Sequence, residues 1–250
     1  MKAGKMRETL TFDDVLLVPQ YSDIQSRSKI DLTLNPAKIF STSLPIVSSP
    51  MDTVTESNMA YAMTSAGGLG IVHRYNTIEE QVLIVKEAVA LGAKNVGAAI
   101  GVSGDFEERA GELYDAGANI LCIDIAHGHH TLMQKAIKAI RNLLGESIHI
   151  MAGNVATLRA FNDLSDWGAD SIRVGVGGGS ICSTRVMTGH GLPTLQSVID
   201  CAASDRDALL VADGGIKQTG DIVKAIAAGA DMVMLGSMPV SYTHLRAHET

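Results

Sequence analysis

Eight short apolar runs, most of them β-branched, recur along the chain from Leu44 onward. They tend to end in glycine, serine or aspartate, and a longer stretch with helical patterning follows most of them. Because strands that alternate with helices form βαβ units, the pattern predicts a parallel sheet. The predicted strands are Leu44–Ser48, Leu69–His73, Asn95–Ile100, Ile120–Ile125, Ile148–Gly153, Ser171–Val174, Leu209–Ala212 and Met232–Leu235.

The helical stretches share a repeated ending. Ala116-Gly-Ala-Asn, Trp167-Gly-Ala-Asp and Ala228-Gly-Ala-Asp each close a predicted helix with a glycine and open the next strand. Recurrence of one βα unit, with eight strands in all, favours an α/β fold of the (β/α)8 TIM-barrel type over the alternative, an open doubly wound sheet. The predicted helices are Glu56–Ala66, Thr77–Leu91, Asp105–Ala116, Thr131–Leu144, Leu158–Trp167, Leu195–Ala203 and Gly220–Ala228. We expect residues 1–43 to form an N-terminal extension that packs on the barrel and residues 44–238 to form one barrel domain.

The composition narrows the class of partner. A formal net charge of −7 argues against a general nucleic-acid binder, which needs a basic face to neutralise phosphates. No apolar run is long enough to span a membrane or to act as a signal peptide. The three cysteines include no close pair, which excludes a C-x-x-C zinc site and favours a reducing compartment. We therefore expect a cytoplasmic protein that binds neither nucleic acid nor membrane.

One loop combines features of an anion site and of a nucleophile. Gly175-Val-Gly-Gly-Gly-Ser180 follows the strand Ser171–Val174, and Cys182 and Thr184 come directly after it. Consecutive N–H groups in a glycine-rich loop can bind an anion, and a thiol close to them can have a lowered pKa. The alternative is a surface turn followed by a buried, inert cysteine.

Other polar clusters follow the predicted strands at the same end of the barrel, where barrel enzymes place their chemistry. These are Ser48–Thr53, Asp124–His129, Asn154, Asp213–Gly215 and Gly236–Ser237. Three separate glycine-containing loops, after the sixth, seventh and eighth predicted strands, meet at this end of the barrel and predict a phosphate site.

Two aspartates at the same end are candidates for ribose binding. Asp213 suits a ribose diol or caps a turn, and Asp124 suits a second ribose or caps the following helix. A metal site at His127, His129 and His130 is the less favoured alternative because no carboxylate or cysteine stands at ligand spacing, while Cys122 and Cys201 are predicted to be packing residues.

Seven segments, spread in order over nearly the whole chain, resemble the IMP dehydrogenase/GMP reductase family. They are Leu10–Pro19, Val47–Glu56, Gly67–His73, Ala152–Thr157, Gly177–Arg185, Ala212–Ile216 and Gly229–Ser237. The resemblance implies a purine-nucleotide oxidoreductase that uses NAD or NADP and acts on a purine nucleoside monophosphate. It also implies a homotetramer.

The resemblance assigns roles to single residues. Cys182 would attack C2 of the purine. The position of Thr184, two residues after Cys182, separately predicts a second catalytic residue that orients a hydroxyl or water toward the same centre. Substrate contacts are implied for Ser49, Met51, Asn154, Ser180, Asp213, Gly214, Gly215, Gly236 and Ser237. Asp124 and Ala126 would contact the dinucleotide. Carbonyls of Gly177, Gly179 and Cys182 match the monovalent-cation loop of the dehydrogenases, which suggests K+, although Gly178 replaces the proline usual there.

Two departures from the family pattern bear on the reaction. The regulatory CBS modules that most dehydrogenases carry between their second and third strands are missing, as they are in reductases and a minority of dehydrogenases. The resemblance stops at Met238, and residues 239–250 read as a non-native tail, so we expect the barrel to be incomplete after its eighth strand and poorly active. IMP dehydrogenase is the leading reaction and GMP reductase the alternative. An inactive nucleotide-binding fragment and another phosphate-binding barrel with a structural Cys182 are the remaining hypotheses.

Overall fold

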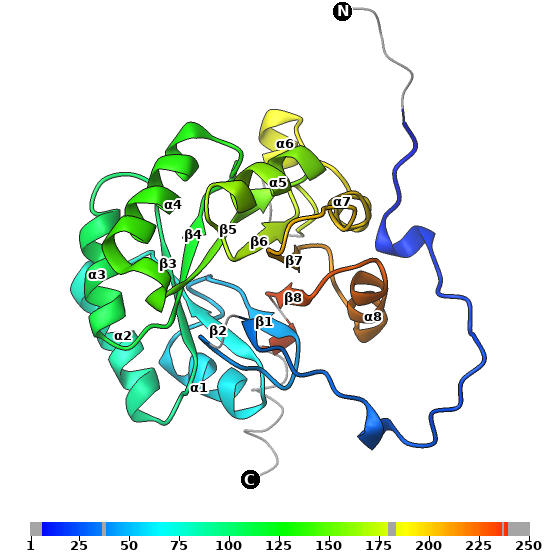
Figure 1. Cartoon of the computed structure of the whole chain (residues 1–250), viewed down its shortest axis with the longest axis horizontal. Helices are drawn as coiled ribbons and strands as arrows, with labels where there is room; N and C mark the ends of the chain where they lie inside the picture. Colours follow the sequence, from blue (N-terminus) through cyan, green and yellow to red (C-terminus); the bar gives the residue numbers. More distant parts are fainter. Residues whose placement is uncertain (1–6, 37–38, 180–183, 237, 240–250) are drawn as a thin grey trace, which may run out of the picture.

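Eight parallel strands close into a barrel with helices around it (Figure 1), in a computed structural model that describes residues 7–36, 39–179, 184–236 and 238–239. Each strand is hydrogen-bonded to the next in sequence, and β8 pairs with β1 to close the ring. The predicted (β/α)8 barrel is confirmed. The strands are β1 Ile46–Ser48, β2 Leu69–Val72, β3 Val96–Ile100, β4 Ile120–Asp124, β5 His149–Val155, β6 Ser171–Val174, β7 Leu209–Asp213 and β8 Met232–Leu235.

Every predicted helix is present, with ends that differ by one or two residues. The helices are α1 Ser57–Ser65, α2 Ile78–Ala90, α3 Phe106–Asp115, α4 Thr131–Leu144, α5 Leu158–Asp166, α6 Thr184–Thr188, α7 Thr194–Cys201 and α8 Thr219–Ala227. The short helix α6, which follows the glycine loop, was not predicted. Among the described residues no helix is long and apolar enough to cross a membrane.

The core has two layers, as the alternation of side chains along each strand requires. One layer fills the barrel interior and includes Cys122, Met151, Met232 and Met234. The other layer lies between the strands and the surrounding helices and includes Cys201. Both cysteines are therefore packing residues, as predicted.

The repeated Gly-Ala-Asn/Asp ending has a structural explanation. Its glycines adopt positive φ values of 107° at Gly117, 111° at Gly168 and 109° at Gly229, which end the helices. Two residues later the side chains of Asn119, Asp170 and Asp231 accept hydrogen bonds from the backbone N–H of Val96, Ile150 and Leu210, respectively. Each repeat thus fastens its own strand to the preceding one at the amino end of the barrel.

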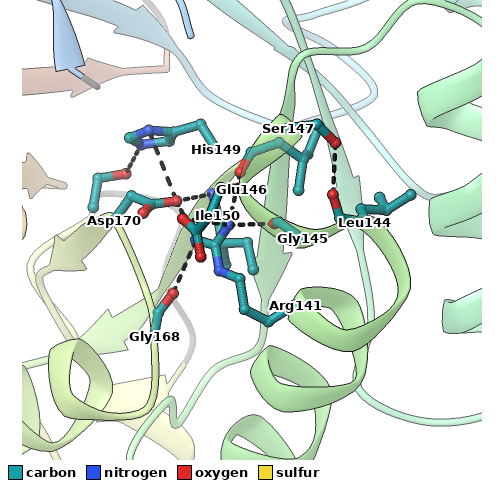
Figure 2. A network of polar contacts seen from close by, with 11 residues as sticks. Arg141, Leu144, Gly145, Glu146, Ser147, His149, Ile150, Gly168 and Asp170 are labelled. Atoms are coloured by element: carbon teal, nitrogen blue, oxygen red, sulfur yellow. Dashed lines mark hydrogen bonds and ion pairs between the residues drawn. The ribbon is translucent and has the colours of Figure 1, made fainter. Parts of the chain in front are cut away.

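A polar network at this amino end holds β5 and β6 together (Figure 2). Arg141 of α4 donates to the carbonyl oxygens of Gly145, Ile148 and Gly168 and pairs with Asp170. His149 is fully buried beside this network, with its Nε2 atom 2.8 Å from Ser171 Oγ.

The N-terminal segment first contacts the helices and then leaves them. Phe12 is buried, and its carbonyl accepts a hydrogen bond of 2.7 Å from Lys224 of α8. Beyond Val15 the segment runs outside the helices, drawn in blue in Figure 1. Its side chains there include Leu16, Val18 and Tyr21, which are 87%, 75% and 95% exposed.

Candidate functional site

A cavity of about 340 Å³ opens at the carboxyl ends of the strands. The βα loops converge there because all eight strands run parallel. Predicted site residues on loops that are far apart in sequence line this one cavity. They are Ser49, Met51, Asp124, Asn154, Gly177, Gly179, Asp213, Gly214, Gly215 and Gly236.

Arg173 lies at the centre of the polar contacts below this cavity, although no site role was predicted for it. Its side chain, from β6, is 7% exposed. It donates to Asp124 Oδ1 at 2.6 Å and, through Nη2, to Asp213 Oδ2 at 2.8 Å. Asn154 Nδ2 donates to the same Asp213 oxygen at 2.7 Å. One guanidinium therefore joins the carboxylates of β4 and β7.

Each of these carboxylates has one oxygen without a hydrogen-bond partner among the described residues. The described residues hydrogen-bond only to Oδ1 of Asp124 and Oδ2 of Asp213. Both residues line the cavity, so the second oxygen of each can accept from a hydroxyl inside it. Two fixed acceptors in one cavity suit two diols.

The electrostatics of the cluster favour its charged state. Burial alone would lower the pKa of Arg173, but the carboxylates of Asp213 and Asp124 outweigh burial and raise that pKa well above its usual value. Burial raises the pKa of Cys122, which lies directly below Arg173, to about 11. Cys122 is therefore a neutral thiol at physiological pH, and its sulfur accepts a hydrogen bond of 3.4 Å from Arg173.

The glycine loop after β6 packs closely against the loop after β7. A Cβ atom on Gly175 would lie 1.8 Å from the carbonyl oxygen of Asp213, and one on Gly214 would lie 3.0 Å from the amide nitrogen of Gly179. Gly214 also has a φ of 88°, which a residue with a Cβ rarely adopts. The glycines thus let two loops approach each other at the cavity wall.

Ser49, Met51 and Gly236 form the β1–β8 side of the cavity. The amide of Ser49 donates to Leu235 at 3.0 Å and continues the pairing between β1 and β8. Ser49 Oγ is buried and has no hydrogen-bond partner among the described residues. This hydroxyl is the kind of polar atom that a bound ligand would satisfy.

Several predicted site residues cannot be compared with this geometry. Ser180, Cys182 and Ser237 lie outside the described residues, and the cation loop includes Cys182, so its K+ remains a prediction. Thr184 is the first residue of α6. Ala126 is exposed on the loop after β4, two residues beyond Asp124.

Two of the three histidines after β4, His129 and His130, support the fold around this loop. His129 Nε2 lies 2.8 Å from Asp163 Oδ2 of α5, and its ring stacks on Trp167 with centroids 5.9 Å apart. His130 caps α4 by accepting from the amide of Leu132. No group of three or more His, Cys, Asp and Glu side chains in the described part of the chain is arranged to hold a metal.

A second cavity, of about 570 Å³, lies on the other side of the glycine loop. The N-terminal residues Thr11–Asp13, the α6–α7 loop and Lys217 line it, and Gly177 and Gly215 separate it from the first cavity. Neither Asp124 nor Asp213 reaches it. The smaller cavity therefore holds the candidate chemistry.

Comparison with known proteins decides the family. The sequence profile of the "IMP dehydrogenase / GMP reductase domain" matches residues 9–244. The chain belongs to the IMP dehydrogenase/GMP reductase family. It is an oxidoreductase of this family, and the family uses NAD(P) cofactors.

Relatives of both activities resemble the chain to a similar degree. The inosine-5'-monophosphate dehydrogenase of Nitrosopumilus maritimus is 34% identical over 361 residues, which cover 94% of this chain and 75% of that protein. The GMP reductase of Leishmania major is 33% identical over 366 residues, which cover 92% of this chain and 74% of that protein. Both alignments are longer than the chain itself, so both relatives carry residues without a counterpart here.

Solved structures of the family share the fold. The inosine 5' monophosphate dehydrogenase of Legionella pneumophila is 46% identical, with a TM-score of 0.85, over 92% of this chain and 70% of that one. A GMP reductase of Trypanosoma brucei is 29% identical, with a TM-score of 0.88, over 94% of this chain and 82% of that one. The fold is therefore common to both activities and does not separate them.

Proposed function

We propose that this chain is the catalytic barrel of an IMP dehydrogenase, which converts IMP, NAD+ and water to XMP and NADH. The pair of carboxylates fixed by Arg173 carries the proposal. Ribose diols donate hydrogen bonds, so the free oxygens of Asp213 and Asp124 suit one nucleotide each. We assign the purine monophosphate to Asp213, next to the glycine loops, and the dinucleotide to Asp124.

The phosphate of the purine nucleotide would bind where the glycine loops meet. Gly214, Gly215 and Gly236 line the cavity, and their backbone N–H groups would be suitable donors to an anion. Ser180 and Ser237, which flank these loops in the sequence, would add hydroxyls. The unpartnered hydroxyl of Ser49 and the sulfur of Met51 would contact the base.

Cys182 is the proposed nucleophile, and this role rests on the resemblance to the family. Its thiolate would add to C2 of IMP, and the C2 hydrogen would leave as a hydride. The dinucleotide supplies the hydride acceptor when it is bound. Water would then hydrolyse the thioimidate on Cys182, which releases XMP and restores the thiol. Covalent catalysis of this kind divides one difficult substitution into two easier steps. Thr184 would orient the water.

The support for a dehydrogenase is the 46% identity to the Legionella enzyme, against 29% for the trypanosomal reductase. Val47–Glu56 and Gly67–Gly70 are also more similar to dehydrogenases. GMP reductase, which converts GMP and NADPH to IMP and ammonia, is the second candidate because Asp124-Ile-Ala126 is reductase-like.

Two turnover assays separate these reactions. We expect NADH to form from IMP and NAD+ at a low rate, because the chain is expected to be poorly active, and no ammonia to be released from GMP with NADPH. Ammonia release without NADH formation would establish the reductase instead. Binding of IMP and NAD+ without either reaction would leave a nucleotide-binding protein.

Covalent labelling tests the nucleophile independently of turnover. A purine nucleotide with a halogen at C2 should modify Cys182, and peptide mapping by mass spectrometry would locate the adduct. Cys122 and Cys201 serve as internal controls because both are buried, and burial raises their pKa values to about 11 and about 12. Modification of either control, or of no cysteine, would contradict the proposed mechanism.

We also propose a homotetramer, and exposed apolar side chains in the N-terminal segment support it. Leu16, Val18 and Tyr21 project from a segment that leaves the barrel, and soluble monomers rarely expose such a cluster. Light scattering after size exclusion should give a tetramer for the native chain. The double substitution Leu16→Asp and Val18→Asp should give a smaller species, and a native monomer would contradict the proposal.

A further inference from the structure

Tyr75 is an aromatic side chain at the cavity that is not among the predicted site residues. It lies on the loop between β2 and α2, it is 64% exposed, and it lines the cavity that Asp124 and Asp213 share. No other aromatic residue lines this cavity among the residues that the structure describes.

The neighbours of Tyr75 fix its position relative to Asp124. Arg74 donates to the carbonyl oxygen of Asp124 at 3.2 Å, and its guanidinium carbon lies 5.5 Å from the centroid of the Tyr75 ring. The ring of His73 is nearly parallel to that of Tyr75, at 19° and a centroid distance of 6.3 Å. The amide of Tyr75 also donates to His73 Nδ1 at 3.2 Å. The aromatic ring is therefore held near the β4 carboxylate.

The same loop carries polar atoms that the protein does not satisfy. Arg74 Nε and both amide atoms of Asn76 are buried without a hydrogen-bond partner among the described residues. Neither Arg74 nor Asn76 lines the cavity, so these atoms show only that the protein leaves polar groups on both sides of Tyr75 unsatisfied.

The cavity is divided between two kinds of wall. The loops after β6, β7 and β8 supply glycine backbone, whereas the loops after β2 and β4 supply an aromatic ring and a carboxylate. If the purine nucleotide binds at the glycine wall, the facing wall receives the second nucleotide, and Asp124 holds its ribose. We propose that Tyr75 is the surface on which the nicotinamide ring of the dinucleotide stacks. This inference rests on the proposed function and adds a residue that selects and orients the cofactor.

The effect should be confined to ligands that carry the nicotinamide ring. Tyr75→Ala removes the ring, whereas Tyr75→Phe retains it and removes only the hydroxyl. An aromatic stack is weak but specific, so we expect Tyr75→Ala to bind NAD+ about fivefold more weakly and Tyr75→Phe to bind it within about twofold of the native protein. The measurement is calorimetric titration of NAD+ into protein saturated with XMP, a pair of ligands that cannot react with each other.

Two comparisons make the measurement decisive. ADP-ribose lacks the nicotinamide ring and should bind equally to the native protein and to Tyr75→Ala. Tyr114→Ala is the matched control. Tyr114 is an exposed tyrosine near the carboxyl-terminal end of α3, and it does not line the cavity. It should leave the affinities for both ligands unchanged.

The outcomes distinguish this inference from the proposed function. If the native protein binds XMP and NAD+ but Tyr75→Ala keeps its NAD+ affinity, the stacking role is wrong while the function stands. Equal weakening of ADP-ribose and NAD+ would assign the ring to the adenosine half and would also overturn the inference. If the native protein binds neither nucleotide, both proposals fail.

Discussion

The two ends of the barrel each contain an arginine surrounded by oxygen acceptors, but the two clusters are organised differently. At the amino end Arg141 donates to three backbone carbonyls and to Asp170, whose Oδ2 atom also accepts from the amide of Ile150 (Figure 2). At the carboxyl end Arg173 binds two side-chain carboxylates and leaves one oxygen of each without a partner among the described residues.

This difference indicates that the cluster at the amino ends of the strands stabilises the fold, whereas the cluster at their carboxyl ends prepares a ligand site. The acceptors of Arg141 are mostly carbonyls of the chain turns, so the contacts fasten α4 to the start of β5 and the α5–β6 turn. The acceptors of Arg173 are carboxylates that can bind a further donor, so its contacts prepare a site. The same division is expected of TIM barrels in general, where the amino end stabilises and the carboxyl end reacts.

Removal of Arg173 should have the largest effect. Arg173→Met would leave two carboxylates close together without their cation, and loss of one partner from a buried ion pair destabilises proteins by about 3–5 kcal/mol. We expect a loss of this order in urea unfolding. Affinity for both nucleotides should also fall, because Asp124 and Asp213 lose their fixed positions together.

Arg173→Lys is the control that retains the positive charge but removes the planar guanidinium group. A single ammonium cannot bind both carboxylates with the geometry of a guanidinium, so this variant should recover stability more than nucleotide affinity. Full recovery of both properties would show that charge alone is required at this position.

His149 should make the amino end sensitive to acid. Burial lowers the pKa of His149 to about 4, compared with about 6.5 in an unfolded chain. The folded protein therefore binds fewer protons between these values, and the free energy of unfolding falls as the pH decreases from about 6.5 towards 4. The loss from this group reaches about 3 kcal/mol at the lower limit.

Urea unfolding between pH 7 and pH 4 measures this slope, and His149→Gln provides the comparison. Glutamine has no ionisable group, so the variant should be less stable at pH 7 but should lose less stability on acidification. An identical pH slope in both proteins would mean that other groups cause the acid sensitivity.

Arg141→Met should destabilise the protein without affecting ligands. The substitution removes donors to three carbonyls and the partner of Asp170, for which we expect a loss of about 2 kcal/mol. Nucleotide affinities should remain within about twofold of the native values because the network lies at the opposite end of the barrel from the cavity. A large loss of nucleotide affinity in folded Arg141→Met would contradict the separation of the two ends.

The fold could be predicted from the sequence because its signals are local. Strand and helix periods, the Thr77 capping box and the repeated Gly-Ala-Asn/Asp turns each depend on residues that are close in sequence. Helix α6 was missed because Thr184–Thr188 is too short to show a helical period. Closure of the barrel followed from the number of repeats.

The site was predicted less completely because its contacts are not local. The positions of Asp124, Asn154 and Asp213 after strands made them candidates, and all three line the cavity, but Arg173 was assigned to an apolar strand without a role. A charge inside a buried parallel strand was a usable signal, since such strands are normally continuous apolar runs. Its partners are 49 and 40 residues away, and sequence spacing could not have identified them. Tyr75 gave no signal before the loops were placed around one cavity.

The smallest predicted effects are losses of ligand affinity that test whether the carboxyl end of the barrel holds two separate nucleotide sites. Asp213→Asn and Asp124→Asn have nearly the shape of the native side chains but weaken the ion pair with Arg173 and remove a charged acceptor. We expect Asp213→Asn to weaken IMP binding about tenfold and Asp124→Asn to weaken NAD+ binding by a similar factor, which corresponds to about 1.4 kcal/mol each. Titration of each ligand into both variants gives four affinities, and the assignment requires that the larger loss follows the assigned ligand in each variant. Equal losses of both ligands in both variants would mean that the carboxylates act as one unit through Arg173, and the two-ribose assignment would then be wrong.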